Sequence, residues 1–162
     1  MLMITTLEML DAEIARWRNN DFKVVLATGV FDLLHIEHVR FLEKAKALGN
    51  ILVVGVETDA RVKRIKGANR PIHPLAIRIE QLEALKSVDK AFVLPENFDD
   101  PKAWLDLLQR INPHIYVVSS NSSHLTNKQA LCAQAQIHFH SIEADNPTMS
   151  STKIEQKLLE LD

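Results

Sequence analysis

Residues 23–38 read KVVLATGVFDLLHIEH, and this stretch decides the fold. Its first six residues are a short apolar run rich in valine, which is typical of a buried strand. Gly29 follows the run and would permit a tight turn and a close approach by a phosphate. His35 and His38 are three residues apart, so at the start of a helix they would share one face. The stretch therefore predicts a strand, a loop and the start of a helix, in that order.

The same alternation continues on both sides of this stretch. Helical spacing of apolar residues predicts helices at residues 6–19, 39–48, 75–85, 100–111 and from residue 152 onward. Continuous apolar runs predict further buried strands at residues 51–56, 91–94, 115–118 and 137–140. Because strand and helix alternate and the strands are apolar throughout, the sequence predicts a parallel sheet that is covered on both faces.

Caps support several of these helices. Gly49 would close the second helix at its C-terminus, and Asp100-Pro101 supplies an N-cap followed by proline at the first helical position. Thr152 with Glu155 would form a capping box for the last helix, which would run through Leu158 and Leu161. We expect one doubly wound α/β domain over residues 1–162, with a five-stranded parallel sheet, helices on both faces and an N-terminal helix at 1–20 packed on it.

Composition and charge exclude several classes of protein. The net charge of −2 gives no general attraction to nucleic acid or to an anionic membrane, so neither is an expected partner. One cysteine, Cys132, permits neither an intrachain disulfide nor a cysteine-based zinc site. No stretch reaches the ~18–20 apolar residues of a membrane span, and the N-terminus lacks the basic start of a signal peptide. We expect a cytoplasmic protein.

The loop after the first strand carries a recognisable motif. GVFDLLHIEH at 29–38 resembles the G-x-F-D-x-x-H-x-G-H signature of the cytidylyltransferase-like nucleotidyltransferases. The similarity continues through residues 23–49, 56–89 and 150–154, which resemble in order the adenylyltransferase domain that makes ADP-heptose from heptose 1-phosphate. Glycerol-3-phosphate cytidylyltransferases are the next group. The resemblance implies a Rossmann-like fold. A homodimer is one candidate assembly, and the sequence leaves the oligomeric state open.

The resemblance also implies a reaction. The phosphate of a phosphorylated small molecule would attack the α-phosphorus of ATP or CTP, and pyrophosphate would leave. His35, His38 and Lys66 would be the catalytic residues, with the two histidines donating hydrogen bonds to the triphosphate. Asp32 would order the loop or the metal, which would be Mg²⁺ carried by the triphosphate rather than held in a protein cage. The nucleotide- and phosphate-binding candidates are Thr28, Gly29, Val30, Phe31, Asp32, Lys63, Arg64, Ser151 and Thr152.

A basic segment follows the second strand. Lys63, Arg64 and Lys66 lie in VKRIKGANRP, where Gly67 and Asn69 predict a mobile loop rather than a helix face. A cluster of charges can also be only a solvated surface. The resemblance implies that the two lysines, and less directly the arginine, contact the phosphates of the nucleotide.

Two further groups have both a binding and a structural interpretation. Ser151 and Thr152 would begin the last helix, where hydroxyl groups and free N–H groups can hold a phosphate or only cap the helix. Arg78 matches a family arginine, but on a helix it could pair only with the nearby Glu80 or Glu83.

The chain departs from the family pattern twice. Glu37 replaces the glycine between the signature histidines, and its charge would repel a phosphate unless it points away, pairs with a base or contacts nucleoside hydroxyls. Val118-Ser119-Ser120-Asn121 replaces a family lysine-glycine-glycine-aspartate stretch. A non-catalytic nucleotide-binding protein of the same fold is therefore the alternative hypothesis, and adenylyl transfer to a flavin or pantetheine phosphate is a further one.

Overall fold

β1 (Val24–Gly29) lies at the centre of a five-stranded sheet, all of whose strands are parallel. This is a computed structural model, and it describes residues 4–146 and 148–160. The other strands are β2 (Ile51–Val56), β3 (Lys90–Val93), β4 (Ile115–Ser119) and β5 (His138–Ile142). The strand order is β3-β2-β1-β4-β5, so the chain moves outward from β1 first on one side and then on the other. The predicted five-stranded parallel sheet is confirmed, with strand ends shifted by one or two residues.

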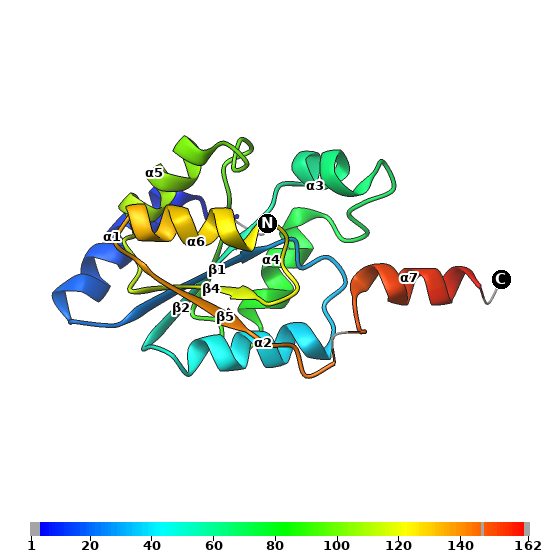
Figure 1. Ribbon diagram of the computed structural model, residues 1–162, viewed down its shortest axis with the longest axis horizontal. Coiled ribbons are helices and arrows are strands. Elements are labelled where there is room, and N and C mark those ends of the chain that lie inside the picture. The colour runs from blue at the N-terminus through cyan, green and yellow to red at the C-terminus, as the bar shows by residue number, and fades with distance from the viewer. Residues whose placement is uncertain (1–3, 147, 161–162) are drawn as a thin grey trace.

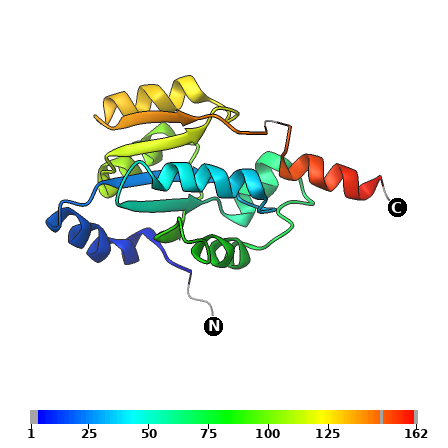
Figure 2. The same ribbon diagram turned by 90° about the horizontal axis from the view of Figure 1, so that it is seen from below.

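Helices cover both faces of the sheet (Figures 1 and 2). One face packs against α1 (Leu7–Asn19), α5 (Pro101–Ile111) and α6 (Leu125–Gln134). The other face packs against α2 (Ile36–Lys46) and α4 (Leu75–Glu83).

Alternate residues of β1 point to opposite faces of the sheet and pack in the two apolar cores. Val24 and Leu26 lie in the layer with α1, whereas Val25 and Ala27 lie in the layer with α2. All four side chains are at least 97% buried. Burial on both faces explains the continuous apolar runs in the sequence, because neither face of a strand meets water.

One of the three predicted helix caps is confirmed, the Asp100-Pro101 start of α5. The Asp100 side chain accepts a hydrogen bond from Lys102 N–H, and Pro101 begins α5, as predicted. Gly49 does not cap α2, which ends at Lys46 with Ala47 as its C-cap. Its lack of a side chain serves packing instead, because a Cβ there would lie 2.5 Å from the Lys23 carbonyl oxygen. α6 was not among the predicted helices; its weakly amphipathic sequence gives little periodic signal.

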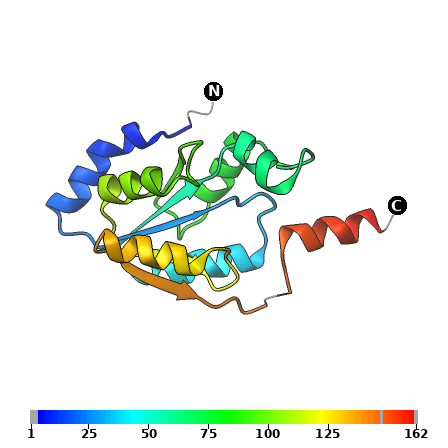
Figure 3. The same cartoon turned by 45° about the horizontal axis from the view of Figure 1, so that its top comes forward.

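Two helices lie beyond the strand ends. α3 (Asp59–Lys66) begins at Thr58, whose hydroxyl accepts a hydrogen bond from Arg61 N–H. The prediction of a mobile loop over Lys63–Lys66 is therefore wrong, because the side-chain cap and the short run before Gly67 are enough for two helical turns. α7 (Ser151–Leu159) extends away from the body of the molecule (Figures 1 and 3). The predicted continuation to Leu161 lies outside the described residues. None of the described helices is long and apolar enough to cross a membrane.

Candidate active site

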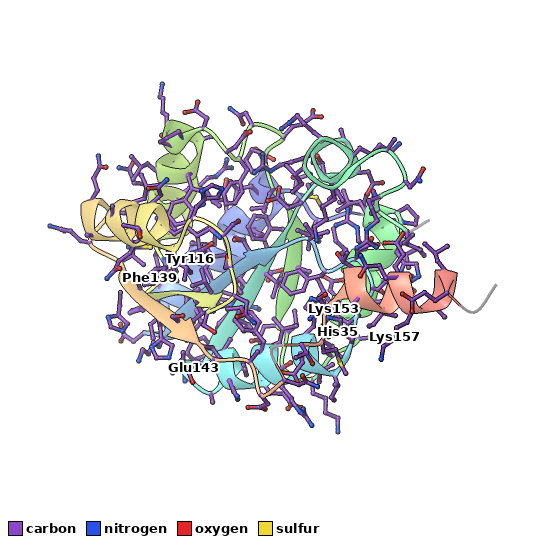
Figure 4. The ribbon with its side chains drawn as sticks, turned by 45° about the vertical axis from the view of Figure 1, so that its right-hand side comes forward. His35, Tyr116, Phe139, Glu143, Lys153 and Lys157 are labelled. Atoms are coloured by element: carbon purple, nitrogen blue, oxygen red, sulfur yellow. The ribbon has the colours of Figure 1, made fainter. Side chains whose placement is uncertain are left out.

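A cavity of about 910 Å³ opens at the edge of the sheet where the strands end. The strand order reverses between β1 and β4, and ligands of open α/β sheets bind at such a point. Most of the residues predicted from the sequence line this cavity: Thr28, Gly29, Val30, Phe31, Asp32, His35, His38, Lys66, Ser151 and Thr152. Figure 4 labels His35 near the start of α2 and Lys153 in the first turn of α7, two segments that contribute to this lining.

His35 and His38 form a stacked pair at the start of α2. Their ring centroids are 3.9 Å apart, and His38 Nδ1 accepts a hydrogen bond from the backbone N–H of His35 at 3.4 Å. Because Nδ1 is an acceptor, the proton of a neutral His38 ring lies on Nε2. Burial, His35 and Lys66 together lower the pKa of His38 to about 4, and burial lowers the pKa of His35 against the opposing charge of Glu37. At neutral pH, His38 is therefore an uncharged hydrogen-bond donor.

Phe31 packs against the ring of His38. The two rings meet edge to face with centroids 5.5 Å apart. Phe31 has a positive φ of 48°, a backbone conformation that costs of the order of 1–3 kcal/mol in a non-glycine residue and occurs mainly at functional sites. Its ring lies over Gly29, where a Cβ would come within 2.9 Å of it. The Phe31 ring therefore occupies the space beside Gly29. The sequence alone predicted that a phosphate could approach there.

Asp32 holds the segment before α4 against the loop. Its carboxylate is 1% exposed, accepts hydrogen bonds from the N–H groups of Ile72 and His73 at 2.9 Å each, and pairs with Arg70 at 2.9 Å. Of the two roles considered for Asp32, the structure supports ordering of the loop. Both carboxylate oxygens accept a backbone hydrogen bond from the segment before α4.

Arg78 does not pair with Glu80 or Glu83. Its side chain is fully buried and donates to the carbonyl oxygens of His73, Val30 and Glu57 and to the carboxylate of Asp59. These partners come from the loop after β1, the end of β2 and the start of α3 and α4. The prediction failed because helical spacing identifies only neighbours on the same helix, whereas Arg78 faces inward across the sheet edge.

The three basic residues of the predicted loop, Lys63, Arg64 and Lys66, point in different directions from α3. Lys66 lines the cavity; burial and the charge of Arg70 lower its pKa, and Asp32 raises it. All three side chains are exposed to some extent, but Lys63 and Arg64 do not line the cavity. Arg64 donates instead to the Glu96 carbonyl oxygen at 3.2 Å. A helix points successive side chains in different directions, so a cluster in the sequence is not a cluster in space.

The start of α7 closes the cavity on another side. The N-cap is Ser150, whose hydroxyl accepts a hydrogen bond from Lys153 N–H, so the predicted capping box of Thr152 with Glu155 is wrong. Ser151 is buried and donates to the Leu33 carbonyl oxygen at 3.0 Å. Glu155 lies 3.6 Å from Arg70, which also pairs with Asp32. This contact joins α7 to the loop after β1.

Glu37 pairs with a base, one of the three possibilities that its sequence position left open. It accepts a hydrogen bond from Arg40 at 2.7 Å and another from the backbone N–H of Asn146 at 3.0 Å, and it is 7% exposed. These two hydrogen bonds lower the pKa of the carboxyl. The carboxylate thus ties the segment between β5 and α7 to α2.

The sequence interpretation missed several charged residues of the cavity, among them Glu57, Arg61 and Lys128. Arg61 of α3 pairs with Glu57 at 2.7 Å and with Asp99 at 3.0 Å. Lys128 of α6 lines the same wall, and burial lowers its pKa. Burial raises the pKa of Glu57, against the opposing charge of Arg61. The carboxyl-edge position of Glu57, directly after β2, could have identified it; no signal in the sequence marks Lys128.

The sequence model of the family described as Cytidylyltransferase-like matches residues 26–157, which include the whole loop and the start of α7. The chain belongs to this family. It is 42% identical over 123 residues to the bifunctional protein HldE of Methylococcus capsulatus, a match that covers 76% of this chain and 25% of that protein. It is also 42% identical over 111 residues to the HldE protein of Acidiphilium cryptum, covering 68% and 22% of the two chains. The chain thus spans about a quarter of the length of these relatives.

Solved structures share the fold. A lipopolysaccharide core biosynthesis protein from Thermoplasma volcanium superposes with a TM-score of 0.63 at 26% identity, covering 77% of this chain and 98% of the other. A pantoate-β-alanine ligase from Francisella tularensis gives a TM-score of 0.65 at 16% identity, covering 99% and 78%. The family resemblance inferred from the loop and the Rossmann-like fold are confirmed.

Proposed function

We propose that this protein transfers AMP or CMP from a nucleoside triphosphate to a sugar phosphate or polyol phosphate and releases pyrophosphate. The observation that carries the proposal is the stacked pair of His35 and His38 at the start of α2, facing a cavity at the reversal point of the sheet. The 42% identity to HldE proteins favours an acceptor of the sugar phosphate type.

In the proposed reaction, an oxygen of the acceptor phosphate forms a bond to the α-phosphorus of the triphosphate. The bond from the α-phosphorus to the bridging oxygen breaks, and pyrophosphate leaves with the electron pair. No covalent intermediate with the protein is needed, so the residues act by positioning and by stabilising charge. His38 donates from Nε2 to the phosphate oxygens on which negative charge builds, and His35 supports it by stacking.

Lys66 and the first turn of α7 supply the other contacts to the triphosphate. Lys66 adds a cation beside His38, whose pKa its charge lowers. The backbone N–H groups at the start of α7, with the hydroxyl of Thr152, offer an anion site of the kind found at helix N-termini. Mg²⁺ would enter on the triphosphate and neutralise part of its charge. Asp32, which has its own partners, orders the loop.

A screen of pyrophosphate release tests the proposal. The four nucleoside triphosphates are each combined with a panel of phosphorylated sugars and polyols and with a flavin phosphate and a pantetheine phosphate, for the parent, His38→Ala and His138→Ala. Release that depends on one triphosphate and one acceptor, and that falls in His38→Ala but not in the exposed-histidine control His138→Ala, is the expected result. Binding of nucleotide without release for any acceptor would favour the non-catalytic alternative, and release with a flavin or pantetheine phosphate alone would replace the acceptor class.

A further inference from the structure

Two basic side chains, Arg61 of α3 and Lys128 of α6, line one wall of the cavity, and only Arg61 is paired with carboxylates. Arg61 is held between two carboxylates, those of Glu57 and Asp99. Its charge is therefore neutralised within the protein, and its side chain is only 12% exposed. A guanidinium with two carboxylate partners has little remaining attraction for an anionic ligand.

Lys128 on the same wall is different. Its ammonium donates a hydrogen bond to the Ser122 hydroxyl at 2.7 Å, and among the described residues no carboxylate lies within 4.0 Å of it. An ammonium has three N–H donors, so two remain for another acceptor. Burial lowers the pKa of Lys128 and the more distant charge of Glu57 raises it. A partly buried cation without an ion-pair partner is unfavourable unless the cavity provides an anion.

Lys128 and the histidine pair line the cavity from opposite faces of the sheet. α6, which carries Lys128, packs on the face that also holds α1 and α5. α2, which begins beside His35 and His38, packs on the other face. We have proposed that the triphosphate binds at the histidine pair and the start of α7, so Lys128 faces the cavity from the side that this proposal leaves unassigned.

We propose that Lys128 binds the phosphate group of the acceptor substrate. This inference rests on the proposed function. A phosphomonoester carries a charge of about −1.5 to −2 at neutral pH and needs a cation that is not already paired. In the proposed reaction the triphosphate has the histidines, Lys66 and the α7 N-terminus. The other basic residues of the lining, Arg40, Lys44 and Arg61, are each paired with a carboxylate, which leaves Lys128 for the acceptor.

The test measures binding and needs no turnover. Titration calorimetry measures the affinity of glycerol 3-phosphate and of inorganic phosphate in the presence of saturating methylene-bridged ATP or CTP analogue, which fills the triphosphate site. We expect Lys128→Met to weaken phosphomonoester binding at least tenfold and Lys128→Arg to retain most of it. The affinity for the triphosphate analogue should change by less than twofold. Lys102→Met removes an exposed cation on α5, outside the cavity lining, and should change neither affinity.

Each outcome decides for or against Lys128. Equal phosphomonoester affinity in Lys128→Met and the parent, or no phosphomonoester binding by the parent, overturns the inference. A loss of analogue affinity in Lys128→Met assigns the lysine to the nucleotide and also overturns it. Failure of the proposed function appears separately, as absent pyrophosphate release in the parent. If neither nucleotide analogue binds, the phosphomonoester titration is repeated without nucleotide. Lys66→Met is then the background, so that the phosphomonoester does not bind at the proposed triphosphate site. Adding Lys128→Met or Lys102→Met to this background gives the same comparison.

Discussion

The imidazole rings of His35 and His38 stack at a centroid distance of 3.9 Å, and their proximity disfavours charge on both. Two protonated rings at this distance would repel each other, and the cavity wall reduces their contact with water. Burial, and after it the charges of His35 and Lys66, lowers the pKa of His38 from 6.5 to about 4. The two uncharged rings therefore donate hydrogen bonds, and the negative charge in the site belongs to the bound polyphosphate.

This depressed pKa makes stability depend on pH. Between pH 6.5 and about 4 the unfolded chain binds a proton at residue 38 that the folded chain does not, so the free energy of unfolding falls as pH falls through this window. The loss is up to about 3 kcal/mol, since one pKa unit corresponds to about 1.4 kcal/mol. Urea unfolding of the parent and of His38→Gln at several pH values measures it. An equally steep fall in His38→Gln would contradict the assignment, and the exposed His138→Gln should retain the parent's slope.

Removal of either histidine should lower turnover far more than stability. Loss of one donor that acts in the transition state typically costs ~10²–10³ in rate. We expect such a loss of kcat in His38→Ala and a loss in His35→Ala, with thermal unfolding at pH 7.5 shifted only slightly in both. Rates of pyrophosphate release, once the substrates are known, check this. Turnover within twofold of the parent in His38→Ala would remove this side chain from the mechanism.

The separation of Lys66 from Lys63 on α3 predicts different effects of the two lysines. Lys66→Ala should weaken binding of the triphosphate roughly tenfold or more, since one charge-assisted hydrogen bond contributes about 1.5–3 kcal/mol. Lys63→Ala, which removes an exposed charge of the same helix outside the cavity, should change the affinity little. Calorimetry at two salt concentrations compares them. Equal affinities in both variants and the parent would show that neither lysine of α3 contacts the triphosphate.

Glu37 should act through the segment it ties to α2. Glu37→Gly removes the acceptor of Arg40 and of the Asn146 N–H, so we expect faster hydrogen exchange at Asn146 and weaker nucleotide binding. Leaving the part-buried Asn146 N–H without an acceptor costs about 1–3 kcal/mol, whereas Arg40 keeps contact with Asp145 and water. Glu43→Gly, at an exposed position of the same helix, corrects for the ~1 kcal/mol cost of glycine in a helix. A gain in nucleotide affinity in Glu37→Gly would show that the carboxylate mainly repels the ligand.

Arg78 should be a major source of stability at the sheet edge. Arg78→Met leaves three carbonyl oxygens and Asp59 without their donor, and we expect the free energy of unfolding to fall by roughly 3–5 kcal/mol. Arg16→Met, at an exposed position of α1, should change it by less than about 0.5 kcal/mol. Urea unfolding compares the variants. A loss of under 1 kcal/mol in Arg78→Met would show that water replaces these contacts.

The sequence by itself determined the strands, most of the helices and the loop that carries the site. Strand hydrophobicity is local and continuous, so the run at residues 23–28 predicted β1 without any knowledge of its partners. The Asp100-Pro101 start of α5 and the helical spacing of His35 and His38 are equally local. These features act within a few residues of one another, which is the range over which a sequence pattern carries information.

Only the tertiary structure decided which side chains face the cavity and with which partners. Glu37 meets Asn146 across 109 residues, and Arg78 meets Val30 across 48, because the strand order brings these segments to one edge of the sheet. Neighbours on one helix diverge in the same way: Lys66 lines the cavity and Lys63 does not. Burial, which lowers the pKa of His38 and of Lys128, likewise exists only once the chain has closed around them. Residue types and spacing specify the groups available, and packing decides which of them remain without a partner and free to bind a ligand.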